Sequence, residues 1–281
     1  MRKNKYIIHT VIAGFILFFA NDAYAQAGSD PPRLFDPHLL NEPSGLGDDI
    51  RQIRFLTESD YPPFQFVRSD GQLTGYNIDL ARAICEDIKV TCTIQAWRWD
   101  KLNEALANGL GDAIIASQKP TSATRMTQSF SAPYYLTPAR FISLKTTSLI
   151  IEKPADMKEK TIGVLANTSH EAYLQQTFPA SPRKTFASLP EAQEALLAAQ
   201  IDTLFADGPT LAIWLADMQG ECCTFRGGAF YNSAFFGEGA RIALRGDDAP
   251  LRTAINASLK RLDAKGILAD LMGKYFPISF Y

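Results

Sequence analysis

Residues 111–135 read GDAIIASQKPTSATRMTQSFSAPYY, and this stretch decides the fold. Its first residues, Asp112 to Ala116, are typical of a short buried strand, and small and polar residues follow. A short helical turn carrying Arg125 is expected next. A strand that runs into a polar turn at a helix start presents free backbone N–H groups and the positive end of the helix dipole. Together with the fork of Arg125, such a turn favours a carboxylate site, although an ordinary solvated arginine is the alternative.

The start of the chain has the layout of a secretory signal peptide. Basic residues precede an apolar run over residues 6–20, and Ala23-Tyr24-Ala25 fits a cleavage site. The apolar run is shorter than the roughly 20 residues that a membrane span needs. We therefore expect a signal peptide over residues 1–25, cleavage after Ala25 and export to the periplasm. Residues 26–50 are rich in Gly, Pro, Asp and Ser and are interpreted as a flexible leader.

The charge of the mature chain argues against two classes of partner. The signal peptide removes three basic residues and one acidic residue from totals of 28 and 30, which leaves 25 basic and 29 acidic residues. A mildly negative chain is not expected to bind nucleic acid or an anionic membrane. The three histidines are not spaced to complete a metal site, and we expect neither a metal nor a cofactor.

The four cysteines belong to a chain that is expected to reach an oxidising compartment, where disulfides form. Cys85 and Cys92 flank a short connection between a helix and a strand, and they can close a small loop. Cys222 and Cys223 are adjacent, so their Cα atoms lie about 3.8 Å apart, inside the usual disulfide minimum of about 4.4 Å. We favour a Cys85–Cys92 disulfide and leave the state of Cys222 and Cys223 open.

The remaining roughly 230 residues alternate strands with helices in two sets. Alternation of this kind predicts parallel strand pairing with crossover helices. Polar residues follow the expected strands in both sets, and open α/β sheets bind ligands at the carboxyl ends of their strands. We therefore expect an α/β protein with two lobes that face each other across a cleft. The expected strands are residues 53–57, 92–95, 112–116, 140–144, 161–165, 203–206 and 241–244.

An ordered set of motifs resembles the bacterial extracellular solute-binding proteins of family 3, the periplasmic polar-amino-acid receptors of ABC importers. The motifs are E-S-D-Y-P-P-F, G-Q-L-T-G-Y-N-I-D, G-D-A-I-I-A-S, T-x-x-x-R, F-S-A-P-Y-Y, I-G-V-L-A-N-T-S and D-T-L-F-A-D. The resemblance runs from about Ile53 to the end of the sequence. It implies a two-lobed periplasmic-binding-protein fold of type II, with two hinge strands. The first lobe would comprise residues 51–138 plus 237–281, and the second residues 139–236.

The same resemblance implies a function in transport. Such a receptor captures an amino acid, or a related small zwitterion or carboxylate, between its lobes. It then delivers this ligand to the permease subunits of an ABC importer, and it is a binding protein, expected here as a monomer, with no catalytic residues. In that family an arginine in a T-x-x-R turn holds the ligand α-carboxylate, helped by hydroxyl groups of both lobes. The matching residues are Arg125, Thr121, Ser117, Thr168 and Ser169.

Other family positions fall on residues with different roles. Asp207 matches an aspartate that takes the ligand ammonium group. Tyr61 and Trp99 match the pair that sandwiches the ligand side chain, although packed core aromatics are the alternative. Glu58 falls where receptors for lysine, arginine and histidine carry an acid that faces the distal cation. Lys119 replaces a small hydroxyl residue common in the family, and it would favour an additional acidic group on the ligand and oppose a cationic one.

The arginine turn departs from the family pattern in its spacing. Three residues separate Thr121 from Arg125, where the family has two, and the register recovers by Phe130. This departure leaves the direction of the Arg125 side chain open.

A second function remains open on the same fold. Periplasmic cyclohexadienyl dehydratases resemble these receptors and also bind a carboxylic or amino-acid-like ligand. They need a positioned acid or base, and the candidates here are Glu58, His170 and Asp207. No paired arrangement of these groups is visible in the sequence.

Overall fold

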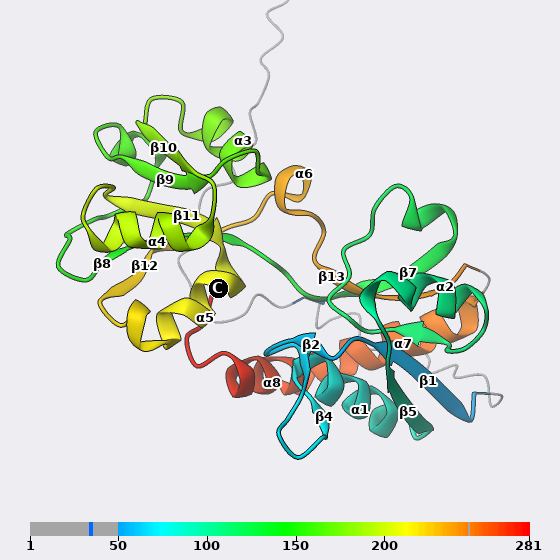
Figure 1. Ribbon diagram of the computed structural model, residues 1–281. Coiled ribbons are helices and arrows are strands. Elements are labelled where there is room, and N and C mark those ends of the chain that lie inside the picture. Colours follow the sequence, from blue (N-terminus) through cyan, green and yellow to red (C-terminus); the bar gives the residue numbers. More distant parts are fainter. Residues whose placement is uncertain (1–33, 36–49, 247) are drawn as a thin grey trace, which may run out of the picture.

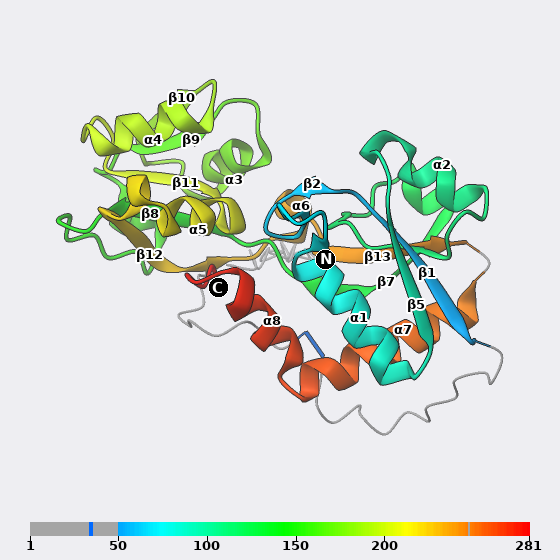
Figure 2. The same cartoon turned by 60° about the horizontal axis from the view of Figure 1, so that its bottom comes forward.

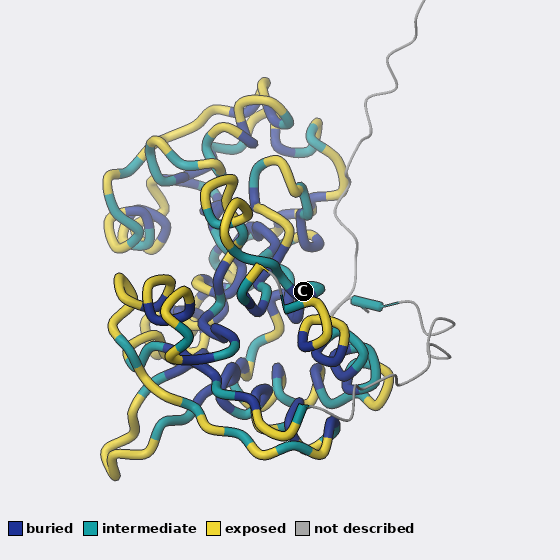
Figure 3. Tube along the Cα trace, turned by 90° about the vertical axis from the view of Figure 1, so that its right-hand side faces the viewer, coloured by how far each residue is buried: buried dark blue, intermediate teal, exposed yellow. Residues whose placement is uncertain are grey.

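Two lobes make up the computed structural model, which describes residues 34–35, 50–246 and 248–281 (Figure 1). The expected signal peptide, and the leader apart from residues 34–35 and 50, lie outside the described residues. Each lobe is built on one five-stranded sheet with helices around it. Buried segments run through the interior of both lobes, and exposed segments form their outlines (Figure 3). The expected two-lobed α/β fold is therefore confirmed.

The sheet of the first lobe combines parallel and antiparallel strands. Its strand order is β5 (Thr91–Ala96), β1 (Gln52–Thr57), β6 (Ala113–Ile114), β13 (Ala240–Arg245) and β7 (Gln128–Tyr135). The first three strands are parallel to one another, as the alternation predicts. β13 is antiparallel to both of its neighbours, because the chain returns from the second lobe and enters this sheet from the opposite end.

Helices cover both faces of this sheet. α1 (Tyr76–Ile88), α7 (Ala249–Ala264) and α8 (Ile267–Tyr275) pack against one another on one face, and α2 (Leu102–Ala107) lies on the other. Successive side chains of a strand point to opposite faces. Phe55 accordingly packs into the core beneath α1 and α7, and Leu56 packs with Leu102 of α2. A small antiparallel sheet of β2 (Asp60–Tyr61), β3 (Gln65–Val67) and β4 (Leu73–Thr74) lies beside this lobe.

The second lobe repeats the layout. Its strand order is β10 (Arg183–Phe186), β9 (Ile162–Leu165), β11 (Thr203–Asp207), β8 (Ala139–Leu144) and β12 (Cys223–Phe230). β9, β10 and β11 are parallel, and β8 is antiparallel to β11 and β12. Two clusters of buried side chains cover the two faces of the sheet. The helical segments are η4 (Pro154–Met157), α3 (Ser169–Thr177), α4 (Leu189–Leu197), α5 (Gly208–Ala216) and η5 (Met218–Gly220).

The chain passes twice between the lobes, and the two passages touch. The first joins β7 to β8, and the second runs from β12 through α6 (Ser233–Phe236) to β13. Gly239 on the second passage has φ +86°, and a Cβ there would lie 2.6 Å from the carbonyl oxygen of Tyr135, the last residue of β7, and 2.9 Å from Cδ2 of Leu136 on the first passage. The two passages therefore form one packed unit between the lobes.

The C-terminal segment also contacts both lobes. Phe280 belongs to the core of the first lobe, whereas Ile278 packs against a core cluster of the second. The guanidinium of Arg140, on β8, donates a hydrogen bond of 2.6 Å to the backbone oxygen of Tyr281. In both ribbon views the last residues lie beside α5 (Figure 2).

The cysteines fall into one bonded pair and one unbonded pair. Cys85 of α1 and Cys92 of β5 form the expected disulfide, with their Cα atoms 6.2 Å apart. Cys222 is exposed and Cys223 is buried, and their Sγ atoms lie 3.4 Å apart without a bond. In the part of the chain that the structure describes, no helix is both long enough and apolar enough to cross a bilayer.

Candidate functional site

The residues expected at the site follow the carboxyl ends of parallel strands in both lobes. Trp99 starts a short helical turn, η2 (Trp99–Lys101), after β5. Glu58 and Tyr61 follow β1, and residues 117–125 follow β6. Because β5, β1 and β6 are parallel neighbours, these three turns meet at one edge of the first sheet. On the second sheet, Thr168 and Ser169 follow β9, and Asp207 ends β11.

The turn around Arg125 differs from the expected anion-binding helix start. η3 (Thr124–Met126) is only three residues long, and the residues of the turn hydrogen-bond to one another. The N–H of Thr121 donates to Thr124 Oγ1 at 2.9 Å, and the N–H of Arg125 donates to the carbonyl of Thr121 at 3.0 Å. The extra residue between Thr121 and Arg125 completes this i to i+4 bond. The backbone N–H groups of Thr121, Thr124 and Arg125 are therefore used within the turn, and the guanidinium of Arg125 adds a charged group that can bind an anion.

The guanidinium of Arg125 is exposed and already contacts a carboxylate. Its Nη2 lies 2.7 Å from Oε2 of Glu238, and the same oxygen lies 3.2 Å from Nη2 of Arg241. Arg125 also lies over the ring of Phe130, with its Cζ 5.9 Å from the ring centroid. The sequence offered no signal for Glu238, which is 113 positions away from Arg125.

Ser117 is fixed by a buried polar network that the sequence did not reveal. Its N–H donates to the hydroxyl of Tyr134 at 3.0 Å, and its Oγ accepts a hydrogen bond of 2.9 Å from Asn77. Asn77 also donates to Gln65, and Gln65 Nε2 donates to Glu58 Oε1 at 3.0 Å. The network thus ties the turn after β1 to the turn after β6. Burial raises the pKa of Glu58, and the hydrogen bond from Gln65 opposes that rise.

Tyr61 and Trp99 are not core aromatics. Their relative exposures are 45% and 53%, large values for side chains of this size. Tyr61 stacks on the buried ring of Phe64, with the centroids 5.2 Å apart, so its orientation is supported from beneath. Both exposed aromatic side chains follow strands that neighbour one another at the same edge of the first sheet as Arg125, and their role as a ligand sandwich stays a prediction.

The second lobe presents two helix starts at its edge. Thr168 caps α3, because its Oγ1 accepts from the N–H of Glu171 at 3.3 Å and donates to the carbonyl of Leu165 at 2.8 Å. Ser169 is exposed, and its hydroxyl makes no hydrogen bond within the described residues. Asp207 caps α5, and its Oδ1 accepts from the N–H and the hydroxyl of Thr210 at 3.2 and 2.9 Å. All three expected second-lobe residues therefore lie at helix starts.

Charges on the two lobes act on each other. Burial raises the pKa of Tyr61 in the first lobe, and the carboxylate of Asp207 in the second lobe adds to that rise. Burial lowers the pKa of His170 in the second lobe; Asp207 opposes this, whereas Lys119 of the first lobe adds to it. Lys119 reaches the passage between the lobes, where its Nζ donates to the carbonyl of Phe236 at 3.4 Å. The ring of Phe236 stacks on His170, with centroids 5.0 Å apart.

The two edges together offer groups of both charges. Glu58 and Asp207 are acids, Lys119 and Arg125 are cations, and hydroxyls and aromatic faces lie among them. Such a set can bind a small zwitterion by its two ends. Within residues 34–35, 50–246 and 248–281, no group of three or more His, Cys, Asp and Glu side chains is arranged to hold a metal ion.

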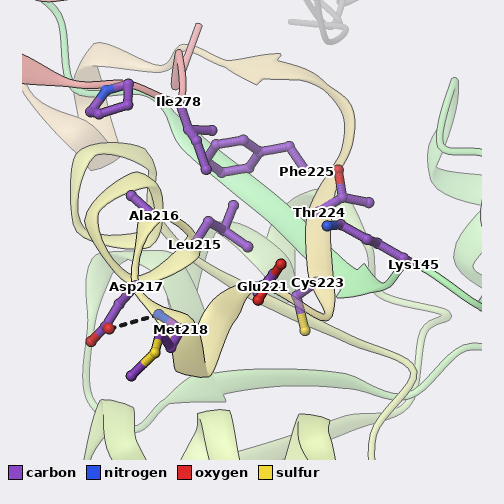
Figure 4. Close-up of a pocket in the computed structure, with 11 residues that line it drawn as sticks. Lys145, Leu215, Ala216, Asp217, Met218, Glu221, Cys223, Thr224, Phe225 and Ile278 are labelled. Carbon is purple, nitrogen blue, oxygen red and sulfur yellow. Dashed lines mark hydrogen bonds between the residues drawn. The ribbon is translucent and has the colours of Figure 1, made fainter. Parts of the chain in front are cut away.

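A separate cavity of about 530 Å³ lies on the second lobe, between α5, η5, β12 and the C-terminal segment (Figure 4). None of the expected site residues lines it. Its lining residues are Lys145, Leu215, Ala216, Asp217, Met218, Glu221, Cys223, Thr224, Phe225, Pro277 and Ile278.

Comparison with known proteins gives a consistent set of relatives. Residues 53–278 match the sequence model of the bacterial extracellular solute-binding proteins, family 3. The L-arginine-binding protein of Pseudomonas aeruginosa PAO1 is 34% identical over 246 residues, which cover 86% of this chain and 94% of that protein. The lysine/arginine/ornithine-binding periplasmic protein of Escherichia coli K12 is 29% identical over 233 residues, covering 82% and 89%.

Solved structures of type II periplasmic binding proteins share this fold. A substrate-binding domain assigned to an amino acid ABC transporter of Streptococcus pneumoniae has a TM-score of 0.68 and 26% identity, covering 80% of this chain and 99% of that one. The unliganded, open L-cystine receptor of Neisseria gonorrhoeae has a TM-score of 0.73 at 17% identity, covering 83% and 95%. The proteins named in these comparisons are described as binding proteins, a receptor or a binding domain, and none of those descriptions mentions a dehydratase.

Proposed function

Because this chain belongs to the bacterial extracellular solute-binding proteins of family 3, we propose that it captures an amino acid between its two lobes and delivers it to the permease of an ABC importer. Members of this family are extracellular or periplasmic, and the proposal places the mature chain, starting at Gln26, in the periplasm as a monomeric binding protein without catalytic activity. The lobes would comprise residues 51–138 plus 237–281 and residues 139–236.

The proposal is carried by one observation, the placement of opposite charges on opposite lobes at the carboxyl ends of parallel strands. Arg125 on the first lobe would take the ligand carboxylate, and Asp207 on the second would take the ammonium group. Ser117, Thr121, Thr168 and Ser169 would supply hydrogen bonds around the carboxylate end of the ligand. A ligand that touches both lobes favours the closed arrangement over the open one, and this difference in affinity drives closure.

The ligand side chain would lie between Tyr61 and Trp99, because both are exposed aromatic residues that follow strands at the same edge of the first sheet as Arg125. Glu58 adjoins this position and would pair with a distal cation, in keeping with relatives that bind arginine, lysine and ornithine. Lys119 would add a cation near the carboxylate end. A first screen should therefore contain basic amino acids and their derivatives with a second carboxylate, such as opines.

The experiment is a thermal-shift screen of these compounds followed by calorimetry. A ligand at about 100 times its dissociation constant should stabilise the protein by about 2.7 kcal/mol. If no amino acid or derivative stabilises the protein, the proposed function is wrong.

Replacement of Arg125 by alanine then tests the carboxylate assignment. Loss of one partner of a desolvated charge pair costs about 2–5 kcal/mol. The exposed pair with Glu238, worth about 0.2–1 kcal/mol, is given up on binding and reduces this figure. We expect a net loss of about 1–5 kcal/mol, at least about fivefold in affinity. Arg68→Ala is the matched control, since Arg68 is an exposed arginine paired with Asp70 in the same lobe. Equal effects of the two variants would contradict the assignment.

A further inference from the structure

The carboxylate of Glu238 contacts the guanidinium of Arg125, the group that would bind the ligand carboxylate in the proposed function. Its Oε2 lies 2.7 Å from Nη2 of Arg125, a short charge-assisted hydrogen bond. The exposures of the two side chains are 47% and 50%, so neither is locked in by burial. A carboxylate arriving from solution would compete with this one for the same fork.

Arg241 gives Glu238 a fixed anchor. Nη2 of Arg241 lies 3.2 Å from Oε2 of Glu238. Arg241 itself is held firmly, since its N–H donates to the carbonyl of Gln118 and its Nη1 donates to the carbonyl of Ser131, both at 2.9 Å. Glu238 can therefore lose Arg125 and keep a cationic partner, so displacement by a ligand does not leave its charge unpaired.

The position of Glu238 connects the carboxylate site to the hinge. It lies on the second passage between the lobes, between Gly237 and Gly239, which have φ values of +82° and +86°. Such values favour glycine, so the flanking backbone has a conformation that other residues rarely adopt. Hinge motions concentrate their dihedral changes in a few residues of this kind of segment. Movement of the passage on closure would shift Glu238 relative to Arg125.

We infer that Glu238 is an internal competitor for the carboxylate site, an inference that rests on the proposed function. In the ligand-free protein its carboxylate holds the fork of Arg125. A ligand carboxylate must replace it, whereupon Glu238 remains with Arg241. Glu238 thus lowers the affinity of the site for every carboxylate by about two- to fivefold.

A first experiment needs no amino acid ligand. Purified wild-type protein and Glu238→Gln are treated with phenylglyoxal, which modifies free guanidinium groups, and modification at each arginine is followed by mass spectrometry. Release of an exposed pair should speed the modification of Arg125 by about two- to fivefold. Arg68 and Arg98, which pair with other carboxylates, should not change. A large excess of sodium acetate should slow the reaction of Arg125 in Glu238→Gln more than in wild type. Equal rates and equal acetate protection in the two proteins would overturn the inference.

A second experiment measures affinity for the amino acid that the screen identifies. Glu238→Gln should bind it about two- to fivefold more tightly than wild type, since the competitor is neutral. Glu104→Gln is the control, because Glu104 forms a similarly exposed pair with Lys101 in the same lobe, and it should leave affinity unchanged. In an Arg125→Ala background the gain should vanish.

The outcomes separate the two hypotheses. If an amino acid binds and Glu238→Gln does not bind it more tightly, the competitor role is wrong and the proposed function stands. If no amino acid binds but acetate protects Arg125 only after removal of the Glu238 charge, the proposed function is wrong. The competition of Glu238 for the guanidinium of Arg125 is then confirmed.

Discussion

Replacement of Asp207 separates two roles that this residue combines. Its carboxylate caps α5 through the N–H and hydroxyl of Thr210, at 3.2 and 2.9 Å, and the proposed function also gives it the ligand ammonium group. Asparagine is as good a helix cap as aspartate, whereas alanine is not. Asp207→Asn therefore removes the charge and keeps the cap, and Asp207→Ala removes both.

The expected magnitudes differ between stability and binding. Loss of the cap in Asp207→Ala should lower the free energy of unfolding by about 0.5–2 kcal/mol, and Asp207→Asn should leave it nearly unchanged. The ligand ammonium group can still donate to the neutral amide oxygen of asparagine, so Asp207→Asn loses the attraction between two opposite charges and keeps one hydrogen bond. The change to asparagine should thus cost about 1–2 kcal/mol of binding free energy, or about 5- to 30-fold in affinity.

Urea unfolding and calorimetry on the same preparations give both numbers. We expect Asp207→Asn to be as stable as wild type and to bind the ligand at least about fivefold more weakly. If Asp207→Asn binds with wild-type affinity, Asp207 is only a helix cap and the ammonium assignment is refuted. Thr210→Val is a useful comparison, because it removes the hydroxyl contact with Asp207 and leaves the carboxylate in place.

Three further results are expected. Replacement of both Cys85 and Cys92 by serine should lower the free energy of unfolding by about 2–3 kcal/mol, since the bond closes a loop in the unfolded chain, whereas Cys222→Ser should have little effect; equal urea midpoints would contradict this. Burial acts to raise the pKa of Asp87, but hydrogen bonds from Arg261 and Lys265 lower it below its usual value. The pKa of Asp87 is therefore lower in the folded protein than in the unfolded chain, so its ion pairs stabilise the fold above about pH 4, and this contribution is lost as the pH falls. The free energies of unfolding of wild type and Asp87→Asn should consequently converge in acid. Incubation with prephenate or arogenate should give no aromatic product, and appearance of one in the ultraviolet spectrum would restore the dehydratase alternative.

Much of the fold was accessible from the sequence, because apolar periodicity reports local structure. The strands expected at residues 53–57 and 161–165 followed from it, and the structure has them as β1 and β9. β12 escaped notice, since its alternation of apolar and polar residues is short and stops at two consecutive glycines, Gly227 and Gly228. The antiparallel direction of β13 was also missed, because it depends on the lobe from which the chain arrives and not on the residues of the strand.

At the site too, residues that follow a strand directly could be predicted from the sequence, whereas contacts between distant segments could not. The polar turns that carry Arg125 and Asp207 were found as residues following buried strands. Gln65 and Asn77 were missed, since each is buried only through contacts with segments elsewhere in the first lobe. The pairing of Arg125 with Glu238 joins residues 113 positions apart, and only the return of the second passage brings them together.

Small-angle scattering with and without the identified ligand tests lobe closure, the central claim, most directly. Two packed passages between rigid lobes allow a hinge rotation, and a ligand held by both lobes favours the closed state. We predict that a saturating amino acid reduces the radius of gyration of the wild-type protein and that Asp207→Asn needs a higher ligand concentration for the same change. Superimposable curves with and without a tightly bound ligand would contradict closure.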